Sequence, residues 1–275
     1  MCFGGRTIAI VSRARVEKVK RYRKVTDRSY RKRIYPRYTS NRMPAFLMYS
    51  ELDYARAAKP ILHRLRGWLP AERKSHCLDV ACGVGQLLYA LKTAGYTNLC
   101  GVDISPEQVA AAKRVWSDVR EADAISFLRS HTENFHFITC FDIVEHFAKD
   151  ELFDFLDALY GALRPGGRVI FQTPNAESPW GLMLRYGDLT HELAFDPNSL
   201  SHALSLAGFN NFEVRGSGPY IHGMRSLVRW VMWRGISAGL RLWNLAETGS
   251  AGSGVYTRVF VAKADKPIAV KNDSL

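Results

Sequence analysis

"HCLDVACGVGQLLYALKTAG", residues 76–95, joins a short apolar run to an amphipathic segment through a turn that contains Gly83 and Gly85. The run 76–81 is typical of a buried strand, and 84–95 is typical of a helix that ends at a glycine. Glycine in such a turn lets the backbone approach a ligand closely, and the N-terminus of the following helix is electropositive. The stretch therefore predicts a strand–turn–helix unit that binds a ligand at its turn.

The same alternation of strand and helix continues towards the C-terminus. Further strands are expected at 98–103, 119–123, 135–142, 168–174, 212–216 and 254–264, and further helices at 105–116, 124–130, 149–163 and 196–209. Short strands that alternate with longer helices indicate βαβ units. The sequence therefore predicts an α/β fold, a Rossmann-like doubly wound sheet whose strands are mostly parallel.

Three carboxylates mark one edge of this sheet, because Asp79, Asp103 and Asp123 lie at or near the ends of the first three strands. Asp103 follows Gly85 by 18 residues, where a carboxylate can accept hydrogen bonds from both hydroxyls of a ribose, and Asp123 can meet an adenine amino group. A dinucleotide fingerprint, GxGxxG, would require a third glycine where Leu88 stands, which disfavours a pyrophosphate ligand. A nucleoside at this edge is the better expectation.

In order and spacing, "LDVACGVGQ", "GVDIS", "EADA", "FDIVEHF" and "LRPGGRVIFQTPN" resemble the successive motifs of class I S-adenosylmethionine-dependent methyltransferases, tightly over 76–175 and more loosely over 176–264. Ala81 stands where that family usually has its first glycine. The resemblance implies a seven-stranded sheet with an antiparallel last strand, and S-adenosylmethionine as the methyl donor. It also implies donor-binding residues: Asp79, Ala81, Gly83 and Gly85 at the methionine part, Asp103 and Ile104 at the ribose, Asp123 and Ala124 at the adenine.

"FDIVEHF", residues 141–147, places Asp142, Glu145 and His146 at the end of the fourth strand, and "LTHELAF" adds His191. Methyl transfer to a hydroxyl needs help in removing the proton, either from a base such as histidine or from a metal ion. We therefore expect His146 and His191 to be catalytic.

Ubiquinone-pathway O-methyltransferases and plant small-RNA 2′-O-methyltransferases have a similar cluster that binds a divalent metal. The resemblance implies Asp142, Glu145, His146 and His191 as ligands, although Phe147 departs from the RNA enzymes, which have a second histidine there. The ion remains open among Mg²⁺, Mn²⁺ and Zn²⁺. Metal binding, a catalytic or substrate-binding role without metal, and structural support of the cofactor loop all stay open as roles of the cluster.

The formal net charge of +12 lies in an N-terminal arm, because residues 1–43 hold 14 Lys and Arg but only 2 Asp and Glu. We interpret this arm as a solvated, partly disordered leader, with anionic lipid or polysaccharide, and then nucleic acid, as alternatives. A helical lead-in is expected at 44–75, followed by the methyltransferase domain at 76–264 and a tail at 265–275.

Residues 221–247 are apolar, but four arginines argue against a membrane span. A pair of helices that covers the active site is the first interpretation, and an element that binds a membrane surface or a partner is the alternative. The five cysteines form no CxxC pair and indicate buried, reduced thiols, and no signal peptide is evident. We expect a cytoplasmic protein, with the arm and 221–247 as candidate contacts with the anionic inner face of the membrane.

The methyl acceptor is indicated by residues 173–209, which are similar to a bacterial methyltransferase group found with cell-surface polysaccharide synthesis. O-methylation of a sugar hydroxyl, on a glycan or its lipid-linked precursor, is therefore the first hypothesis, with Arg185 and Tyr186 as candidate acceptor contacts. A small phenolic or quinone-like acceptor and an RNA 2′-hydroxyl are the alternatives. A cofactor-binding partner protein without catalysis is the least favoured, because Glu145 and His146 are both present.

Overall fold

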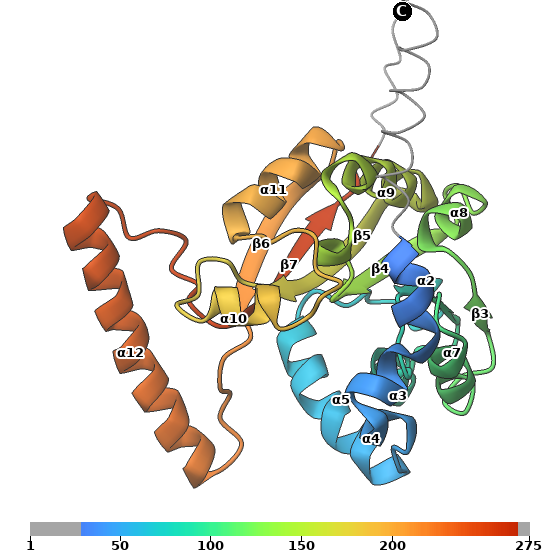
Figure 1. Ribbon diagram of the computed structural model, residues 1–275, viewed down its shortest axis with the longest axis horizontal. Coiled ribbons are helices and arrows are strands. Elements are labelled where there is room, and N and C mark those ends of the chain that lie inside the picture. Colours follow the sequence, from blue (N-terminus) through green and yellow to red (C-terminus); the bar gives the residue numbers. More distant parts are fainter. Residues whose placement is uncertain (1–28, 269–275) are drawn as a thin grey trace, which may run out of the picture.

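The computed structural model describes residues 29–268 and contains one seven-stranded sheet (Figure 1). Its strands are β1 (Cys77–Val80), β2 (Leu99–Asp103), β3 (Val119–Glu121), β4 (Phe135–Phe141), β5 (Leu163–Pro174), β6 (Asn210–Gly216) and β7 (Val259–Asp265). The order is β3-β2-β1-β4-β5-β7-β6, and only β7 runs antiparallel to its neighbours. The predicted Rossmann-like sheet with an antiparallel last strand is confirmed.

Helices pack on both faces of the sheet. The helices of the described residues are α2 (Ser29–Ile34), η1 (Tyr35–Arg37), α3 (Tyr38–Arg42), α4 (Pro44–Leu47), α5 (Glu51–Leu65), α6 (Gln86–Thr93), α7 (Pro106–Ala112), α8 (Ala124–Arg129), η2 (Val144–His146), α9 (Lys149–Ala162), α10 (Gly181–Tyr186), α11 (Pro197–Leu206) and α12 (Met224–Thr248). One core joins the sheet to α5, α6 and α7, and the other joins it to α8, α9 and α11.

The apolar runs of the sequence become strands that are buried on both faces. Phe137 and Ile138, successive residues of β4, belong to opposite cores because successive side chains of a strand point to opposite faces. In the register of β1, Asp79 lies between Gly101 and Thr139. The carboxyl ends of β1, β2 and β4 therefore meet at one edge of the sheet, where ligands bind in this class of fold.

The described part of the N-terminal arm differs from the prediction of a solvated leader. Residues 29–42 form α2, η1 and α3, and these pack against the carboxyl edge of the sheet. Thr39 and Ser40 donate their backbone amides to Glu107 at 2.6 and 2.9 Å, which fastens α3 to the first turn of α7. The residues of the arm before 29 lie outside the described part of the chain.

The prediction of two helices over the active site at 221–247 is wrong. The segment forms the single helix α12, and no residue of it lines the cavity described below. The reason is topological: α12 connects β6 to β7 at one end of the sheet, whereas β4 is the central strand and β1 and β2 lie beyond it towards the other end (Figure 1). Within residues 29–268, no helix combines the length and the apolar character required to span a membrane.

The cysteines within the described residues agree with the prediction of buried thiols. Cys77, Cys82, Cys100 and Cys140 are all free and buried in or beside the sheet. Burial raises the pKa of Cys77 and Cys100 to about 12, so both remain protonated at neutral pH. Cys2 lies outside the described residues.

Candidate active site

A cavity of about 690 Å³ lies at the carboxyl ends of β1, β2 and β4. It brings together the predicted donor-binding residues other than Gly85 and the predicted catalytic and metal-binding residues. Those that line it are Asp79, Ala81, Gly83, Asp103, Ile104, Asp123, Ala124, Asp142, Glu145, His146 and His191. Residues that are far apart in the sequence therefore share one cavity.

The backbone conformation of the turn after β1 explains why glycine stands at positions 83 and 85. It also explains why alanine is tolerated at position 81, where the family usually has glycine. All three residues adopt left-handed backbone conformations, with φ of 57° at Ala81, 56° at Gly83 and 87° at Gly85. Alanine pays roughly 1 kcal/mol for such a conformation, so Ala81 keeps the shape of the turn at a small cost. Gly85 is the N-cap of α6, and a Cβ there would lie 3.2 Å from the Cα of Ala112. Gly85 thus allows α6 and α7 to approach each other instead of lining the cavity.

Asp103, the last residue of β2, lines the cavity and fixes the backbone of two neighbouring loops. Its Oδ2 accepts the backbone amide of Gly83 at 2.9 Å, and its Oδ1 accepts that of Ser105 at 2.8 Å. Burial raises its pKa to about 6, although these amide bonds favour the ionised form. Each oxygen keeps a further lone pair, so the carboxylate can accept the two hydroxyls of a ribose. Ile104, about half exposed in the cavity, offers an apolar surface beside it.

Asp79 and Asp123 complete the acidic edge in different ways. Asp79 is buried and accepts a hydrogen bond from Thr139 Oγ1 at 2.8 Å. Asp123 is the N-cap of α8, where its Oδ1 accepts the amide of Ser126 at 2.9 Å. The cavity thus contains the buried carboxylate of Asp79 beside the turn and the helix-capping carboxylate of Asp123 near β3. Their positions follow the order of the motifs in the sequence.

Glu145, His146 and His191 form a compact cluster beside the acidic edge. One potential ligand atom of each lies within 4.8 Å of the others. Burial lowers the pKa of His146 to about 3 and that of His191 to about 4, so both imidazoles are neutral at physiological pH. Burial, together with the charge of Asp142, raises the pKa of Glu145 well above its usual range. A buried carboxyl and two neutral imidazoles thus converge on one point.

The hydrogen bonds of the cluster leave one lone pair on each imidazole and the Oε1 atom of Glu145 available to a ligand. The Nδ1 atoms of His146 and His191 lie 3.3 and 3.0 Å from the carbonyl oxygens of Thr190 and Leu184. Because a carbonyl only accepts, both Nδ1 atoms carry the proton and both Nε2 atoms keep a lone pair. Glu145 Oε1 is buried and has no hydrogen-bond partner among the described residues. Two imidazole nitrogens and one carboxylate oxygen, oriented by backbone partners, fit a divalent cation.

Asp142, the fourth predicted ligand, does not belong to this cluster. Its side chain lines the cavity, where Oδ2 accepts a hydrogen bond from Gln172 Nε2 at 2.9 Å. Its backbone is left-handed, with φ of 51°, a conformation that aspartate tolerates better than most residues. Asp142 therefore adds negative charge beside Glu145 without joining the three ligand atoms.

The loop that carries His191 is fastened directly to Glu145. The amides of Glu192 and Leu193 donate to the Glu145 carbonyl at 2.8 and 3.0 Å. Arg185, a candidate acceptor contact, instead donates to the carbonyls of His191 and Glu192. It and Tyr186 lie outside the lining of the cavity. The structure thus places Arg185 as a support of the His191 loop.

Several residues at the cavity were not expected from the sequence. Asp188 is buried, accepts hydrogen bonds from Tyr38 and Thr190, and forms an ion pair with Arg42. Its Oδ2 also lies 3.7 Å from His191 Nε2. From α2, Arg31 donates to the His146 carbonyl at 2.7 Å. The arm therefore forms part of the wall around the histidines. No local pattern predicts the contacts that Arg31 and Tyr38 make, because their partners lie more than 100 residues away in the sequence.

Comparison with known proteins agrees with this geometry. A family model described as a methyltransferase domain matches residues 50–214, more than half of the chain. A ubiquinone biosynthesis O-methyltransferase of Actinobacillus pleuropneumoniae is 32% identical over 36% of this chain and 45% of its own length. A small RNA 2′-O-methyltransferase of Mus musculus is 29% identical over 51% of this chain and 40% of its own length. The chain thus spans less than half the length of these curated relatives.

Among solved structures, a SAM-dependent methyltransferase from Archaeoglobus fulgidus superposes with a TM-score of 0.56, at 21% identity, over 78% of this chain and 94% of that one. This superposition shows a shared fold, whereas the family match shows a shared sequence pattern. Both agree with the motifs that surround the cavity. The chain belongs to the class I S-adenosylmethionine-dependent methyltransferases.

Proposed function

We propose that the protein methylates a hydroxyl group, and that the acceptor is a sugar hydroxyl of a surface glycan or its precursor. The observation that carries the first part is the cluster of Glu145, His146 and His191, which shares one cavity with the donor-binding edge. A hydroxyl must lose its proton during transfer, and this cluster supplies groups that can promote that loss. The match to two O-methyltransferases supports the same reaction class.

In the proposed reaction, the acceptor oxygen attacks the methyl carbon of the donor, the carbon–sulfur bond breaks, and the hydroxyl proton leaves. S-adenosylmethionine supplies the methyl group on a positively charged sulfur. The neutral imidazoles of His146 and His191 can accept the proton at Nε2, because each Nδ1 is occupied by a backbone carbonyl. A divalent cation held by Glu145, His146 and His191 would instead polarise the hydroxyl and lower its pKa.

The rim of the cavity supports a polar acceptor. Arg31, Tyr35, Tyr38, Arg42 and Arg64 all contribute to its lining. The positive charges and ring faces of these side chains suit sugar hydroxyls or nearby anionic groups. The competing acceptor, a phenolic or quinone-like molecule, was expected to lie under an apolar cover formed by 221–247, and no residue of that segment lines the cavity.

The acceptor is tested by labelled methyl transfer from S-adenosylmethionine, with surface glycan extracts, catechol and short RNA offered in parallel. We expect transfer to the glycan fraction, and a chelator should abolish it if the cation is required, with activity restored by Mn²⁺ or Zn²⁺. Transfer to catechol alone, or to RNA with a steep loss of RNA affinity in salt, would replace the sugar hydroxyl as acceptor. Donor binding without transfer to any acceptor would contradict the enzymatic proposal.

A second prediction concerns the buried carboxylate Asp79. Burial, with a smaller contribution from Asp103, raises its pKa to about 7, so the folded state resists its ionisation. A raised carboxyl pKa means that stability is lost as pH increases from about 4 towards 7. Asp79→Asn should therefore increase the free energy of unfolding at about pH 8 by roughly 1–3 kcal/mol and weaken donor binding, because the charge is removed.

Urea unfolding at about pH 5 and pH 8 measures this effect, since the pH dependence should be smaller in Asp79→Asn than in the wild type. Asparagine can still accept the hydrogen bond from Thr139, so the packing of β1 against β4 is preserved. Asp157→Asn, on the exposed side of α9, is the matched control and should change little. Lower stability of Asp79→Asn at pH 8 would show that the ionised carboxylate contributes to the fold.

A further inference from the structure

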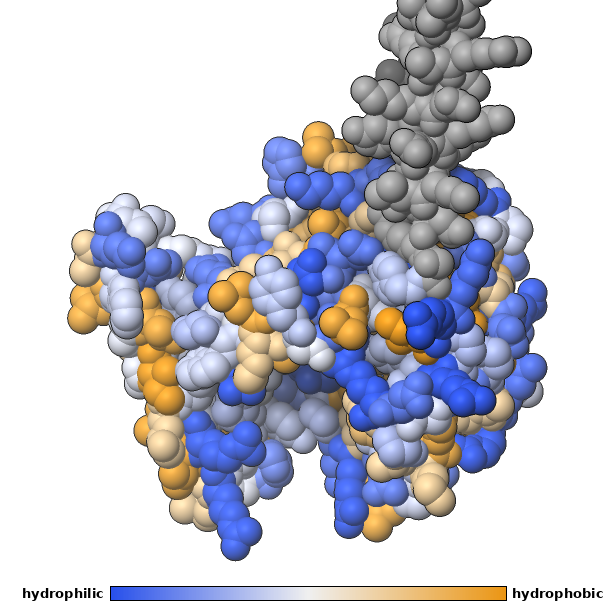
Figure 2. Space-filling view, viewed as in Figure 1, coloured by the Kyte–Doolittle hydropathy of each residue, from blue (hydrophilic) through white to orange (hydrophobic). Residues whose placement is uncertain are grey.

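The helix α12 carries a broad set of apolar side chains on the side that faces away from the rest of the protein. Ser226 is buried, and Trp233 and Asn244, on the same side of the helix, are half-buried. The opposite side is exposed and apolar, and Figure 2 shows hydrophobic residues along the outer side of the helix. The exposed residues, each 46–76% accessible, are Met224, Val228, Val231, Met232, Ile236, Leu242, Trp243 and Leu245. A helix that packs on its own domain has its apolar side against the domain and its polar side in solvent, whereas α12 has a broad apolar side in solvent.

The exposed apolar surface of α12 is wider than the stripe through which two helices contact each other in a coiled coil. Residues 228, 231, 242 and 245 would form the narrow stripe at heptad spacing that a coiled coil needs. Met232, Ile236 and Trp243 extend the apolar surface along one flank, so that it covers about half of the helix circumference, at 100° per residue. A broad apolar side is typical of a helix that lies in the plane of a lipid surface.

The charges around this side are almost all positive. α12 holds four arginines, at 225, 229, 234 and 241, and a single acidic residue, Glu247. Residues 214–246 contain five arginines and no Asp or Glu. A second copy of the chain would bring these arginine-rich helices together, and like charges would repel each other. An anionic surface has the complementary charge.

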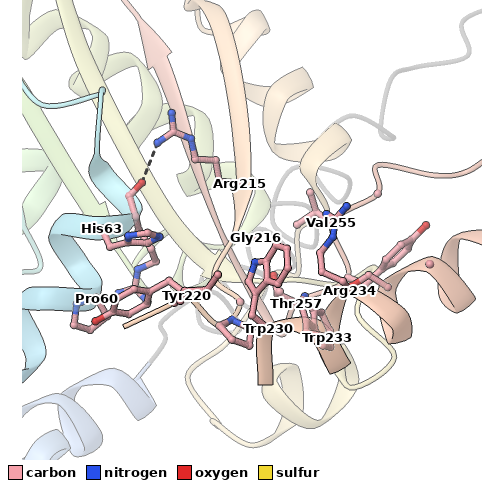
Figure 3. Close-up of a pocket in the computed structure, with 18 of the residues that line it drawn as sticks. Pro60, His63, Arg215, Gly216, Tyr220, Trp230, Trp233, Arg234, Val255 and Thr257 are labelled. Carbon is pink, nitrogen blue, oxygen red and sulfur yellow. Dashed lines mark hydrogen bonds between the residues drawn. The ribbon is translucent and has the colours of Figure 1, made fainter. Parts of the chain in front are cut away.

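A second cavity, of about 650 Å³, lies behind α12 and repeats this charge pattern. Arg64, Arg66, Arg215, Arg234 and Arg241 line it, and no carboxylate does. In Figure 3, His63 and Tyr220 lie on one side of this cavity, and Trp230, Trp233 and Arg234 lie on the other. Guanidinium groups bind phosphate well, and Trp favours the boundary between headgroups and acyl chains.

We propose that α12 is an interfacial helix that seats the protein on an anionic lipid surface. Its outer side enters the boundary of the headgroups and acyl chains, and the arginines beside and behind it meet lipid phosphates. The helix lies on the surface and does not cross it, in agreement with the arginines along its length. This proposal is independent of the acceptor, because no residue of α12 lines the catalytic cavity.

The test is co-sedimentation of the full chain with vesicles of equal parts phosphatidylglycerol and phosphatidylcholine. Leu242→Glu should lower the partition coefficient by about tenfold or more, because it removes an inserted side chain and adds a negative charge at an anionic surface. Leu206→Glu on α11 is the matched control, since Leu206 and Leu242 are 64% and 66% exposed. It should bind as the wild type does. The wild type, Leu242→Glu and Leu206→Glu all contain the basic arm. Any attraction of the arm to the vesicles is therefore the same in all three and does not affect the comparison.

Two further measurements make the outcome decisive. Brominated acyl chains should quench part of the tryptophan fluorescence in the wild type and less in Leu242→Glu, because Trp243 lies on the inserted side. Equal binding of Leu242→Glu and wild type, or no binding by the wild type, would overturn the proposal. So would light scattering that shows a wild-type dimer which Leu242→Glu dissociates, since the exposed side would then belong to a second copy. None of these results bears on methyl transfer, which is assayed without vesicles and tests the proposed function separately.

Discussion

Replacing His191 by alanine should reduce turnover by about 100-fold or more while leaving the affinity for S-adenosylmethionine nearly unchanged. The imidazole Nε2 of His191 lies 3.9 Å from Glu145 Oε1, which has no hydrogen-bond partner among the described residues, so His191 belongs to the cluster that we propose to act on the acceptor. Asp79 and Asp103, the predicted donor-binding residues, come from different strands and not from the loop that carries His191. The measurement compares kcat with the donor Kd obtained by calorimetry.

The variant also distinguishes a metal ligand from a general base. If His191 binds a cation, the wild type should lose activity with a chelator and regain it with Mn²⁺ or Zn²⁺, and His191→Ala should bind the ion far more weakly. If His191 is the base alone, the chelator should have no effect on the wild type. His202→Ala, on the exposed side of α11, is the matched control. An equal loss of donor binding and turnover in His191→Ala would mean that the residue only supports the fold.

The gathering of the predicted donor-binding residues at one edge of the sheet could be predicted, because it depends on local patterns and one topological rule. An apolar run identifies each strand, and parallel strands bring their carboxyl ends to one edge. Asp103 and Asp123 could therefore be placed together without knowledge of any long-range contact. Even the departure at Ala81 left the turn intact, because alanine tolerates the left-handed conformation at a small cost.

The acceptor side was less predictable because its contacts are distant in the sequence. Asp188 meets Tyr38 across 150 residues, and nothing in the composition of the basic arm distinguishes a residue that packs on the site from one in solvent. The error at 221–247 has a related cause. The apolar composition of the segment favoured helices, but it could not show whether their apolar side chains face the protein or face outwards.

The largest effect on donor binding is expected from Asp103→Asn. The two oxygens of Asp103 each accept a backbone amide, from Gly83 and from Ser105. Asparagine supplies only one acceptor, so its amide group would face one of these N–H groups and push that part of the turn away. The ribose hydroxyls would also lose a charged acceptor, and each such hydrogen bond contributes about 1.5–3 kcal/mol. We expect the affinity for S-adenosylmethionine to fall by about 100-fold or more.

Calorimetric titration with the donor and with S-adenosylhomocysteine measures this loss, and thermal unfolding checks that the variant is folded. Because burial disfavours the charge on Asp103, the neutral asparagine should not make the protein markedly less stable, so weak binding would report on the site itself. Asp118→Asn, close in sequence but on the surface and paired with Arg120, removes the same charge and should bind the donor normally. Wild-type affinity in Asp103→Asn would mean that the donor is held elsewhere in the cavity, and the assignment of the ribose to the end of β2 would then be wrong.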